Sequence, residues 1–142
     1  MTIREYMTTD VRTVDGQTTL AEAAQVMRDT DTGVVPVVSG AVIEGVITDR
    51  DIVIRAIAEG ADPNTALVQD YLTRNPTYAE PDTTIQQATQ LMQRDQVRRL
   101  PVVEGTQLVG IISIGDLAVD TGQDRLIGDT LQDISRPTDA AP

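Results

Sequence analysis

The sequence of 142 residues contains no lysine, histidine, cysteine, tryptophan or phenylalanine. Without histidine or cysteine, the chain has no imidazole base, no thiolate nucleophile, no zinc cluster built from those ligands and no disulfide. Without lysine, it has no Schiff base and no P-loop lysine. Catalysis by side chains would therefore depend on carboxylates, hydroxyls, tyrosine and arginine.

The charge balance is strongly acidic. Eleven arginines oppose 22 aspartates and glutamates, which gives a formal net charge of −11. This excess of acid argues against nucleic acid or an anionic membrane as the main partner, because both require a basic face. The longest apolar stretch, Val34–Val38, is far too short to span a membrane, and Met1–Glu5 begins no apolar signal region. We therefore expect a soluble, cytoplasmic, globular protein.

The chain contains an internal duplication at an offset of 65 residues. Without any gap, residues 3–54 align with residues 68–119, and 14 of these 52 pairs are identical. Chance would give roughly three identical pairs at ordinary residue usage. The identical pairs are Tyr6/Tyr71, Thr8/Thr73, Thr18/Thr83, Thr19/Thr84, Ala23/Ala88, Gln25/Gln90, Met27/Met92, Pro36/Pro101, Val37/Val102, Val38/Val103, Gly40/Gly105, Gly45/Gly110, Ile47/Ile112 and Asp51/Asp116. A unit of some 50 residues is thus used twice.

Each repeat predicts a helix that starts at a capping box. Thr19 is followed three positions later by Glu22, and Thr84 by Gln87, so hydroxyl and side-chain carbonyl can satisfy free backbone N–H groups. Apolar residues then recur at helical spacing, which directs one stripe of each helix towards a core. The stripes consist of Leu20, Ala23, Ala24 and Met27, and of Ile85, Ala88 and Met92.

A hairpin is predicted after each of these helices. Its strands are β-branched runs separated by glycine, at Val34–Val38, Val42–Ile47, Leu100–Val103 and Leu108–Ile112. Pro36 and Pro101 favour an edge or a bulge. A second helix follows Thr48 and Ser113, the first copy running through Ile52, Ile54 and Ile57. Extended pieces at Thr13–Val14 and Tyr78–Ala79 complete a β-α-β-β-α order.

One repeat alone would expose too much apolar sheet to be stable. We therefore predict an α/β (α+β) fold of two β-α-β-β-α units, related by a pseudo-twofold axis with their sheets packed together, and two related clefts between them. The predicted boundaries are 1–60 and 61–121, joined through a linker at Glu59–Asn64. Residues 122–142 are expected to form a short amphipathic helix and a loose tail; its apolar stripe is Leu126, Ile127, Leu131 and Ile134.

The same motif ends the hairpin of each repeat: Gly45–Asp51 (GVITDRD) and Gly110–Asp116 (GIISIGD). Each places a hydroxyl and a carboxylate three residues apart at a helix start. Such a pair is a capping signature. Capping is the favoured interpretation of the motif taken alone. A strand end that leads into a helix beside a cleft can also bind a ligand, because helix N–H groups favour phosphate and a carboxylate can accept hydrogen bonds from a ribose diol. The two roles are compatible.

These features together resemble a pair of CBS domains, the cystathionine-β-synthase regulatory module. The resemblance covers residues 3–119 and depends on the tandem unit, the VPVV and LPVV strands and the Gly-x-x-[Thr/Ser]-x-x-Asp ending. Segments 48–54 (TDRDIVI), 62–65 (DPNT) and 97–102 (VRRLPV) are similar to small stand-alone CBS-pair proteins, some of them linked to stress or hypoxic response.

The resemblance implies a regulatory ligand of the adenosyl type, namely AMP, ADP, ATP or S-adenosylmethionine, bound between the units. It assigns the ribose to Asp51 with Thr48 and to Asp116 with Ser113. By matching position, the adenine of the first cleft would contact Tyr78 and Ala79, and that of the second cleft Thr13 and Val14. Basic residues before the Leu-Pro strand, here Arg98 and Arg99, would meet phosphate.

The charges predict that the two clefts differ. Arg98 and Arg99 align with Gly33 and Val34, while Arg50 aligns with Gly115. A pair of arginines can hold a phosphate by forked hydrogen bonds. Their alternative role is a salt bridge with Asp95 or Glu104. Arg55 is a weaker candidate than Arg50, and Asp49 would crowd a phosphate near Arg50.

Three functions can be compared. The first is a non-catalytic nucleotide sensor, a homodimer through its helices, that signals by changing conformation or by binding an unknown protein target. The alternative is a protein-interaction module with degenerate clefts, favoured by the lack of a large aromatic beside adenine. An enzyme that uses Asp49 and Asp51 for metal-assisted hydrolysis is disfavoured, because these carboxylates lie on opposing sides of a helix turn and Ile114 replaces Asp49 in the second repeat. We therefore predict no catalytic residue, no metal site and no nucleic-acid partner.

Overall fold

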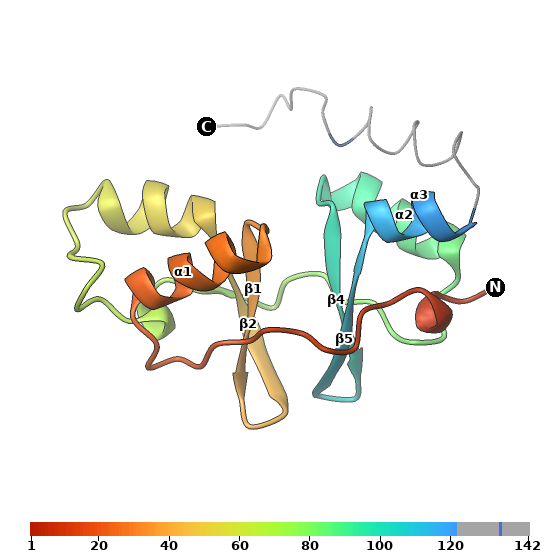
Figure 1. The fold of residues 1–142 in the computed structure, drawn as a ribbon, viewed down its shortest axis with the longest axis horizontal. Helices are drawn as coiled ribbons and strands as arrows, with labels where there is room; N and C mark the ends of the chain where they lie inside the picture. Colours follow the sequence, from red (N-terminus) through yellow and green to blue (C-terminus); the bar gives the residue numbers. More distant parts are fainter. Residues whose placement is uncertain (122–133, 135–142) are drawn as a thin grey trace. The chain divides into compact units, whose positions relative to one another are not determined.

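The computed structural model describes residues 1–121 and residue 134. It is a mixed structure of helices and antiparallel hairpins, in which the α+β class is confirmed (Figure 1). The chain forms two compact units. The N-repeat unit contains Asp10–Pro76 and Gly105–Leu108, and the C-repeat unit contains Met1–Thr9, Thr77–Glu104 and the described residues from Val109 onward.

The N-repeat unit is built from the first repeat and the start of the second. Its elements are α1 (Leu20–Thr30), β1 (Val34–Ser39), β2 (Val42–Thr48), the π-helix η2 (Asp51–Ile57), the 3₁₀ turn η3 (Val68–Asp70) and β3 (Thr73–Arg74). The remaining elements are the 3₁₀ turn η1 (Ile3–Glu5), α2 (Ile85–Asp95), β4 (Arg99–Glu104), β5 (Gln107–Ser113) and α3 (Ile114–Thr121). These remaining elements belong to the C-repeat unit, except for Gln107 and Leu108 at the start of β5, which belong to the N-repeat unit.

The predicted capping boxes start both α1 and α2. Thr19 accepts a hydrogen bond from the Glu22 amide, and Thr84 accepts one from the Gln87 amide, while the Glu22 and Gln87 side chains reach back to the cap residues. Three members of the first predicted stripe, Leu20, Ala23 and Met27, are buried in the core, whereas Ala24 is exposed, so that stripe is narrower than predicted. All members of the second stripe are buried, including Met92. Both helices end at a residue with left-handed backbone, Asp31 and Gln96.

Both predicted hairpins are present. In the first, β1 and β2 are antiparallel, and the register shifts between Val37 and Val38, next to Pro36. The extended piece at Val14 pairs in parallel with Val37, and the Pro36 carbonyl accepts from the Val14 amide at 3.1 Å. Ala79 pairs in parallel with Val102 in the same way. Pro36 thus lies beside a bulge, where the missing N–H costs little.

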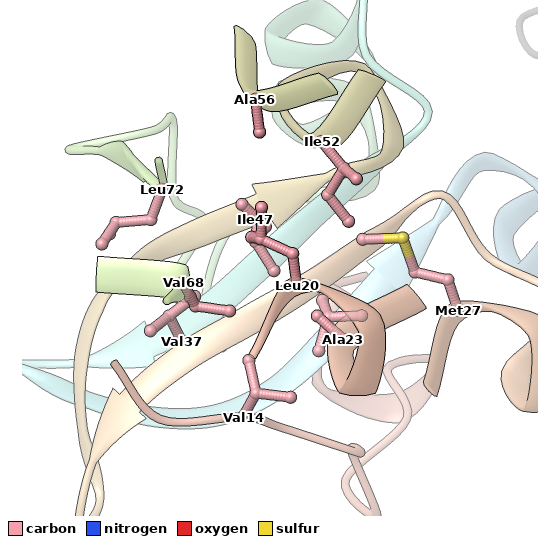
Figure 2. Close-up of a cluster of buried hydrophobic side chains, with 11 residues drawn as sticks. Val14, Leu20, Ala23, Met27, Val37, Ile47, Ile52, Ala56, Val68 and Leu72 are labelled. Atoms are coloured by element: carbon pink, nitrogen blue, oxygen red, sulfur yellow. The ribbon is translucent and has the colours of Figure 1, made fainter. Parts of the chain in front are cut away.

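The two compact units exchange their first segments. Each repeat begins with a short 3₁₀ turn that packs into the core of the unit formed by the other repeat. Ile3 is buried with Leu100, Val102 and Met92, whereas Val68 is buried with Leu20 and Val37. Figure 2 shows Val68 and Leu72 among the side chains from α1, the hairpin and η2. The compact units therefore do not begin and end where the repeats do.

Two further expectations concern the second helices and the tail. After Thr48 the helix continues to Ile57 as predicted, but from Asp51 it has π geometry, whereas its counterpart α3 is an α-helix. Ile52 and Ala56 face the core, while Ile54 and Ile57 are exposed. The predicted helix and loose tail of residues 122–142 lie outside the described residues except Ile134, which packs against the core of the C-repeat unit.

Candidate functional site

The first motif lies where β2 ends and the next helix begins. The Thr48 amide donates to Asp51 Oδ2 at 3.1 Å, and the Asp51 amide donates to Thr48 Oγ1 at 3.0 Å. Two free N–H groups at the helix start are thereby satisfied by the two motif side chains. The capping interpretation of this motif is confirmed.

The second motif has the same geometry at the junction of β5 and α3. The Ser113 amide donates to Asp116 Oδ2 at 3.1 Å, and the Asp116 amide donates to Ser113 Oγ at 3.1 Å. Serine and threonine therefore perform the same local role. The two motifs differ in their surroundings, because the hydrogen bonding within each pair is the same.

The motif glycines allow another segment to cross the strand. A Cβ atom on Gly45 would lie 2.2 Å from the Thr73 carbonyl oxygen, and one on Gly110 would lie 2.8 Å from the Thr8 carbonyl oxygen. Thr73 pairs with Val46, and Thr8 with Ile111, at equivalent register. The motif glycine thus lets the exchanged segment cross at the same place in both units, and in the N-repeat unit this crossing puts the Thr73 hydroxyl within hydrogen-bonding distance of Asp51.

Asp51 is held by more than its cap. Thr73 Oγ1 donates to its carboxylate, 3.1 Å from Oδ2 and 3.2 Å from Oδ1. Arg55 Nη1 lies 3.5 Å from Oδ1 and also donates to the Tyr71 carbonyl at 2.7 Å. Asp51 is only 6% exposed, the one charged side chain in the buried part of the described chain. Sequence reasoning missed Thr73 in this role, because the identical pair Thr8/Thr73 marks the position and does not reveal its contact with Asp51.

Asp116 has a simpler environment. It is half-buried, and among the described residues its carboxylate has only the Ser113 amide as a hydrogen-bond donor. The position that matches Arg55 is Asp120, another acid. Thr8 matches Thr73 and pairs through its backbone with Ile111.

The predicted phosphate contacts lie in the C-repeat unit. The Ile114 amide, next to Ser113, donates to the Arg98 carbonyl at 2.9 Å, so the exposed Arg98 lies beside the second motif. Arg99 follows as the first residue of β4 and is half-buried. The matching contact in the N-repeat unit joins the Asp49 amide to the Gly33 carbonyl, also at 2.9 Å.

The side-chain charge beside the motif, at the matched positions Gly33 and Arg98, is opposite in the two units. A Cβ atom on Gly33 would lie 2.7 Å from Asp49 Oδ2, so a carboxylate covers the place that Arg98 holds in the other unit. Asp49 would repel a phosphate there. The predicted inequality of the two motifs is thus present in the charges immediately around each of them.

The alternative partners of the two arginines are engaged elsewhere. Asp95 pairs with Arg94 at 3.1 Å, and Glu104 lies 3.9 Å from Arg4. Within the described part of the chain neither Arg98 nor Arg99 makes a salt bridge. Hydrogen bonds from Arg94 and from Thr77 lower the pKa of Asp95 below its usual value of 3.8.

The other residues predicted to contact the nucleotide are divided between the units. Thr13, Val14 and the exposed Arg50 belong to the N-repeat unit, and Tyr78 and Ala79 to the C-repeat unit. Val14 and Ala79 are buried within their own units. Tyr78 is half-buried, and this burial raises the pKa of its hydroxyl. Their assignment to an adenine remains a prediction.

A groove of ≈ 500 Å³ lies apart from the first motif, and its lining includes Thr13, Val14, Glu22 and Asp29. A groove of ≈ 570 Å³ beside α2 is lined by Thr83, Gln87, Gln90, Leu91 and Arg94, which match residues of the first groove in the repeat. Glu22 and Asp29 are replaced by Gln87 and Arg94, so the first groove is the more acidic one.

The duplicated unit and its paired motifs define a tandem regulatory module. The CBS domain family is matched over residues 3–57 and 68–119. The chain therefore belongs to the CBS domain family and carries a pair of these domains, which form a regulatory module.

The relatives are of the same kind. The chain is 39% identical over 133 residues to the CBS domain-containing protein YhcV of Bacillus subtilis, which covers 94% of both proteins. It is 39% identical over 118 residues to Hypoxic response protein 1 of Mycobacterium tuberculosis, which covers 82% of both. The resemblance to the hypoxic-response subgroup is thereby confirmed.

Two solved structures resemble the chain. The crystal structure of Hypoxic Response Protein I with two coordinated zinc ions matches at a TM-score of 0.77 and 38% identity, over 84% of this chain and 98% of that one. The crystal structure of CBSX2 in complex with AMP matches at a TM-score of 0.75, over 87% and 98%, and its 23% identity shows the fold alone.

The chain has neither histidine nor cysteine, and no group of three or more acidic side chains in the described part is placed to share a metal ion. Of the helices that the structure describes, none has the length and apolarity needed to cross a bilayer.

Proposed function

We propose that this chain is a non-catalytic regulatory module that binds an adenosyl nucleotide (AMP, ADP, ATP or S-adenosylmethionine) and signals through a ligand-dependent conformation or partner. The observation that carries the proposal is the hydroxyl and carboxylate pair, repeated at the strand-to-helix junction of both units. The fold is shared with CBSX2, which has been solved with AMP. As part of the proposal, we expect these ligands in clefts between the two repeats.

The chemistry of the second motif suits this ligand class. A carboxylate that retains free lone pairs can accept both hydroxyls of a ribose, as Asp116 would. The N-terminus of α3 favours the negative charge of a phosphate, and Arg98 adds a fork of donors beside it. No covalent step is part of this proposal, so the absence of lysine, histidine and cysteine is no obstacle.

Isothermal titration with AMP, ATP and S-adenosylmethionine, at low and high salt, tests the proposal directly. We expect heat from at least one of the three, and we expect Asp116→Ala to remove binding at the second motif. GTP serves as the matched control, because it keeps the ribose and phosphates and changes only the base. Absence of heat from all three adenosyl compounds would contradict the proposal.

A second candidate is a protein-interaction module that binds no nucleotide. It is favoured by the first motif, where Asp51 is already engaged by Thr73 and Arg55 and where Asp49 opposes phosphate. Mass spectrometry of the natively purified protein separates the two functions. A copurifying adenosyl compound supports the sensor, whereas a nucleotide-free protein that also gives no heat supports the interaction module.

The proposal includes a homodimer formed through helices and a cytoplasmic location. On η2, Val53, Ile54 and Ile57 are 55%, 54% and 45% exposed, a set of large apolar side chains that a second copy would cover. The absence of cysteine is compatible with a reducing compartment. Light scattering of the native protein and of Ile54→Asp tests the dimer, because a charge at a buried apolar interface would dissociate it.

A further inference from the structure

We infer that the two motif aspartates have different roles in this chain: Asp51 is an internal structural carboxylate held by Thr73 and Arg55, and nucleotide binding is limited to one per chain, at Asp116. The limit on stoichiometry rests on the proposed function. The structural role of Asp51 does not, and it can be tested without any ligand.

The acceptor capacity of Asp51 is largely used. A carboxylate offers about four lone-pair sites. Oδ2 accepts from the Thr48 amide and lies 3.1 Å from Thr73 Oγ1, and Oδ1 lies 3.5 Å from Arg55 Nη1. Both hydroxyls of a ribose would have to displace the Thr73 hydroxyl and the Arg55 guanidinium. The carboxylate is also buried, so any donor lost without replacement would leave a buried charge unsatisfied.

Arg55 is anchored at a second point, which makes its displacement harder. The same Nη1 atom that faces Asp51 donates to the Tyr71 carbonyl at 2.7 Å. Tyr71 in turn donates its hydroxyl to Glu59 at 2.6 Å, at the end of the helix region that carries Arg55. Arg55 therefore connects η2 to the segment after the linker as well as neutralising Asp51. Its side chain is half exposed, so the ion pair alone is weak and the hydrogen-bonded set matters more.

Within the part of the chain that the structure describes, the second motif shows neither a threonine hydroxyl nor an arginine on its carboxylate. In the sequence, the residue that matches Arg55 is the acid Asp120, so the second repeat carries no cation at that position. Among the described residues, the Asp116 carboxylate accepts from the Ser113 amide alone. The nearby cation is Arg98, which lies beside Ser113 and is available to a phosphate. Both repeats thus have the motif aspartate, and among the described residues Asp51 alone has side-chain donors.

Thermal unfolding without nucleotide tests the structural half of the inference. Asp51→Asn and Asp116→Asn make the same change at equivalent caps, because each removes a negative charge and leaves an amide oxygen as acceptor, so a difference between them reflects the surroundings of Asp51, chiefly Thr73 and Arg55. We expect Asp51→Asn to lower the melting temperature by roughly 5–10 °C and Asp116→Asn by less than half as much. Thr73→Val should likewise lower it more than the matched Thr8→Val. Equal effects in both pairs would overturn the inference.

Because Asp51→Asn could prevent folding, the exposed Arg55→Gln provides a milder variant. Combined with Thr73→Val, it should show coupling, since both act on one carboxylate. Arg28→Gln is the control, as Arg28 also pairs with an aspartate in the same unit, at 3.1 Å from Asp29, but on an exposed helix surface. Strict additivity of Arg55→Gln and Thr73→Val would contradict the shared role.

Titration with AMP tests the stoichiometry. We expect one nucleotide per chain in the native protein, none after Asp116→Asn, and a second one in Arg55→Gln/Thr73→Val, where the Asp51 carboxylate is released. Two nucleotides per chain in the native protein would overturn the inference and leave the proposed function intact. If AMP, ATP and S-adenosylmethionine bind to no variant, the proposed function fails, and the unfolding experiment still decides the role of Asp51.

Discussion

The Ile3 amide donates to the Thr83 carbonyl at 2.9 Å, and the Val68 amide donates to the Thr18 carbonyl at 2.8 Å. These four residues are related by the same offset of 65, so each repeat lends its first segment to the other. A salt bridge between Arg4 and Asp82 at 3.1 Å adds to the first of these contacts. The unit that contains the second motif therefore depends on the start of the chain.

This exchange predicts where a mutation in the first residues acts. Ile3 is fully buried, so Ile3→Ala should lower the free energy of unfolding by about 2–5 kcal/mol. Hydrogen exchange should show the loss of protection mainly in α2 and β4, although Ile3 is near the N-terminus. The matched Val68→Ala should act on α1 and β1 instead, and the exposed Met1→Ala is the control. Loss of protection in α1 alone after Ile3→Ala would contradict the exchange.

The close approach of Thr73 to Gly45 predicts that a side chain at this position destabilises the fold. Gly45→Ala would put a Cβ atom 2.2 Å from the Thr73 carbonyl oxygen, so β3 must move away from β2. We expect a loss of several kcal/mol, roughly 2–4, since backbone atoms have to shift. Denaturant unfolding measures it. Gly110→Ala should be milder, because the contact with Thr8 is 2.8 Å.

Gly115→Ala is the control for Gly45→Ala. Its Cβ atom would lie 3.7 Å from Ser113 Oγ, an ordinary contact, and alanine is the better helix former by about 1 kcal/mol. We therefore expect it to be neutral or slightly stabilising. A similar loss for Gly115→Ala and Gly45→Ala would show that the motif tolerates no change of backbone freedom, rather than that Thr73 crosses at Gly45.

Asp95 predicts a specific pH dependence. Its pKa is lowered in the folded chain by hydrogen bonds from Arg94 and Thr77. A carboxylate with a lowered pKa stabilises the fold above its unfolded pKa, and this contribution is lost as the pH falls through the folded value. The Asp95→Asn variant should therefore be less stable than the native chain at pH 7, and the difference should shrink as the pH falls from 3.8 through the lowered pKa of Asp95. Urea unfolding at pH 7 and pH 3 measures this; an unchanged difference would contradict it.

Local patterns in the sequence were sufficient for most of the fold. The capping boxes at Thr19 and Thr84 and the β-branched runs depend on neighbours within a few residues, and the structure has them where they were predicted. The exchange of the first segments was not predictable in this way. Ile3 and Val68 match in the repeat, and an apolar residue carries no information about which of two similar cores it enters.

In the candidate site, too, the local hydrogen bonds were predictable from the sequence and the contacts between distant segments were not. The pairs Thr48/Asp51 and Ser113/Asp116 depend on spacing along the chain, and both are formed. The extra donors on Asp51 come from β3 and from the next helical turn, so Thr73 could be assigned only after the strand register was known. The salt-bridge alternative for Arg98 also required the structure, because it depended on where Asp95 finds its partner.

Arg98 and Arg99 lead to a prediction about the ligand. If they meet phosphate, replacing both with glutamine should weaken ATP binding far more than adenosine binding, since only ATP carries the charge. Two charge-assisted contacts at about 1.5–3 kcal/mol each would reduce the ATP affinity by roughly 10²-fold or more. The salt dependence of ATP binding should fall in the same variant, because fewer ions are exchanged. Arg94→Gln is the matched control, as Arg94 is engaged by Asp95. Equal losses for ATP and adenosine would mean that these arginines support the strand rather than the phosphate.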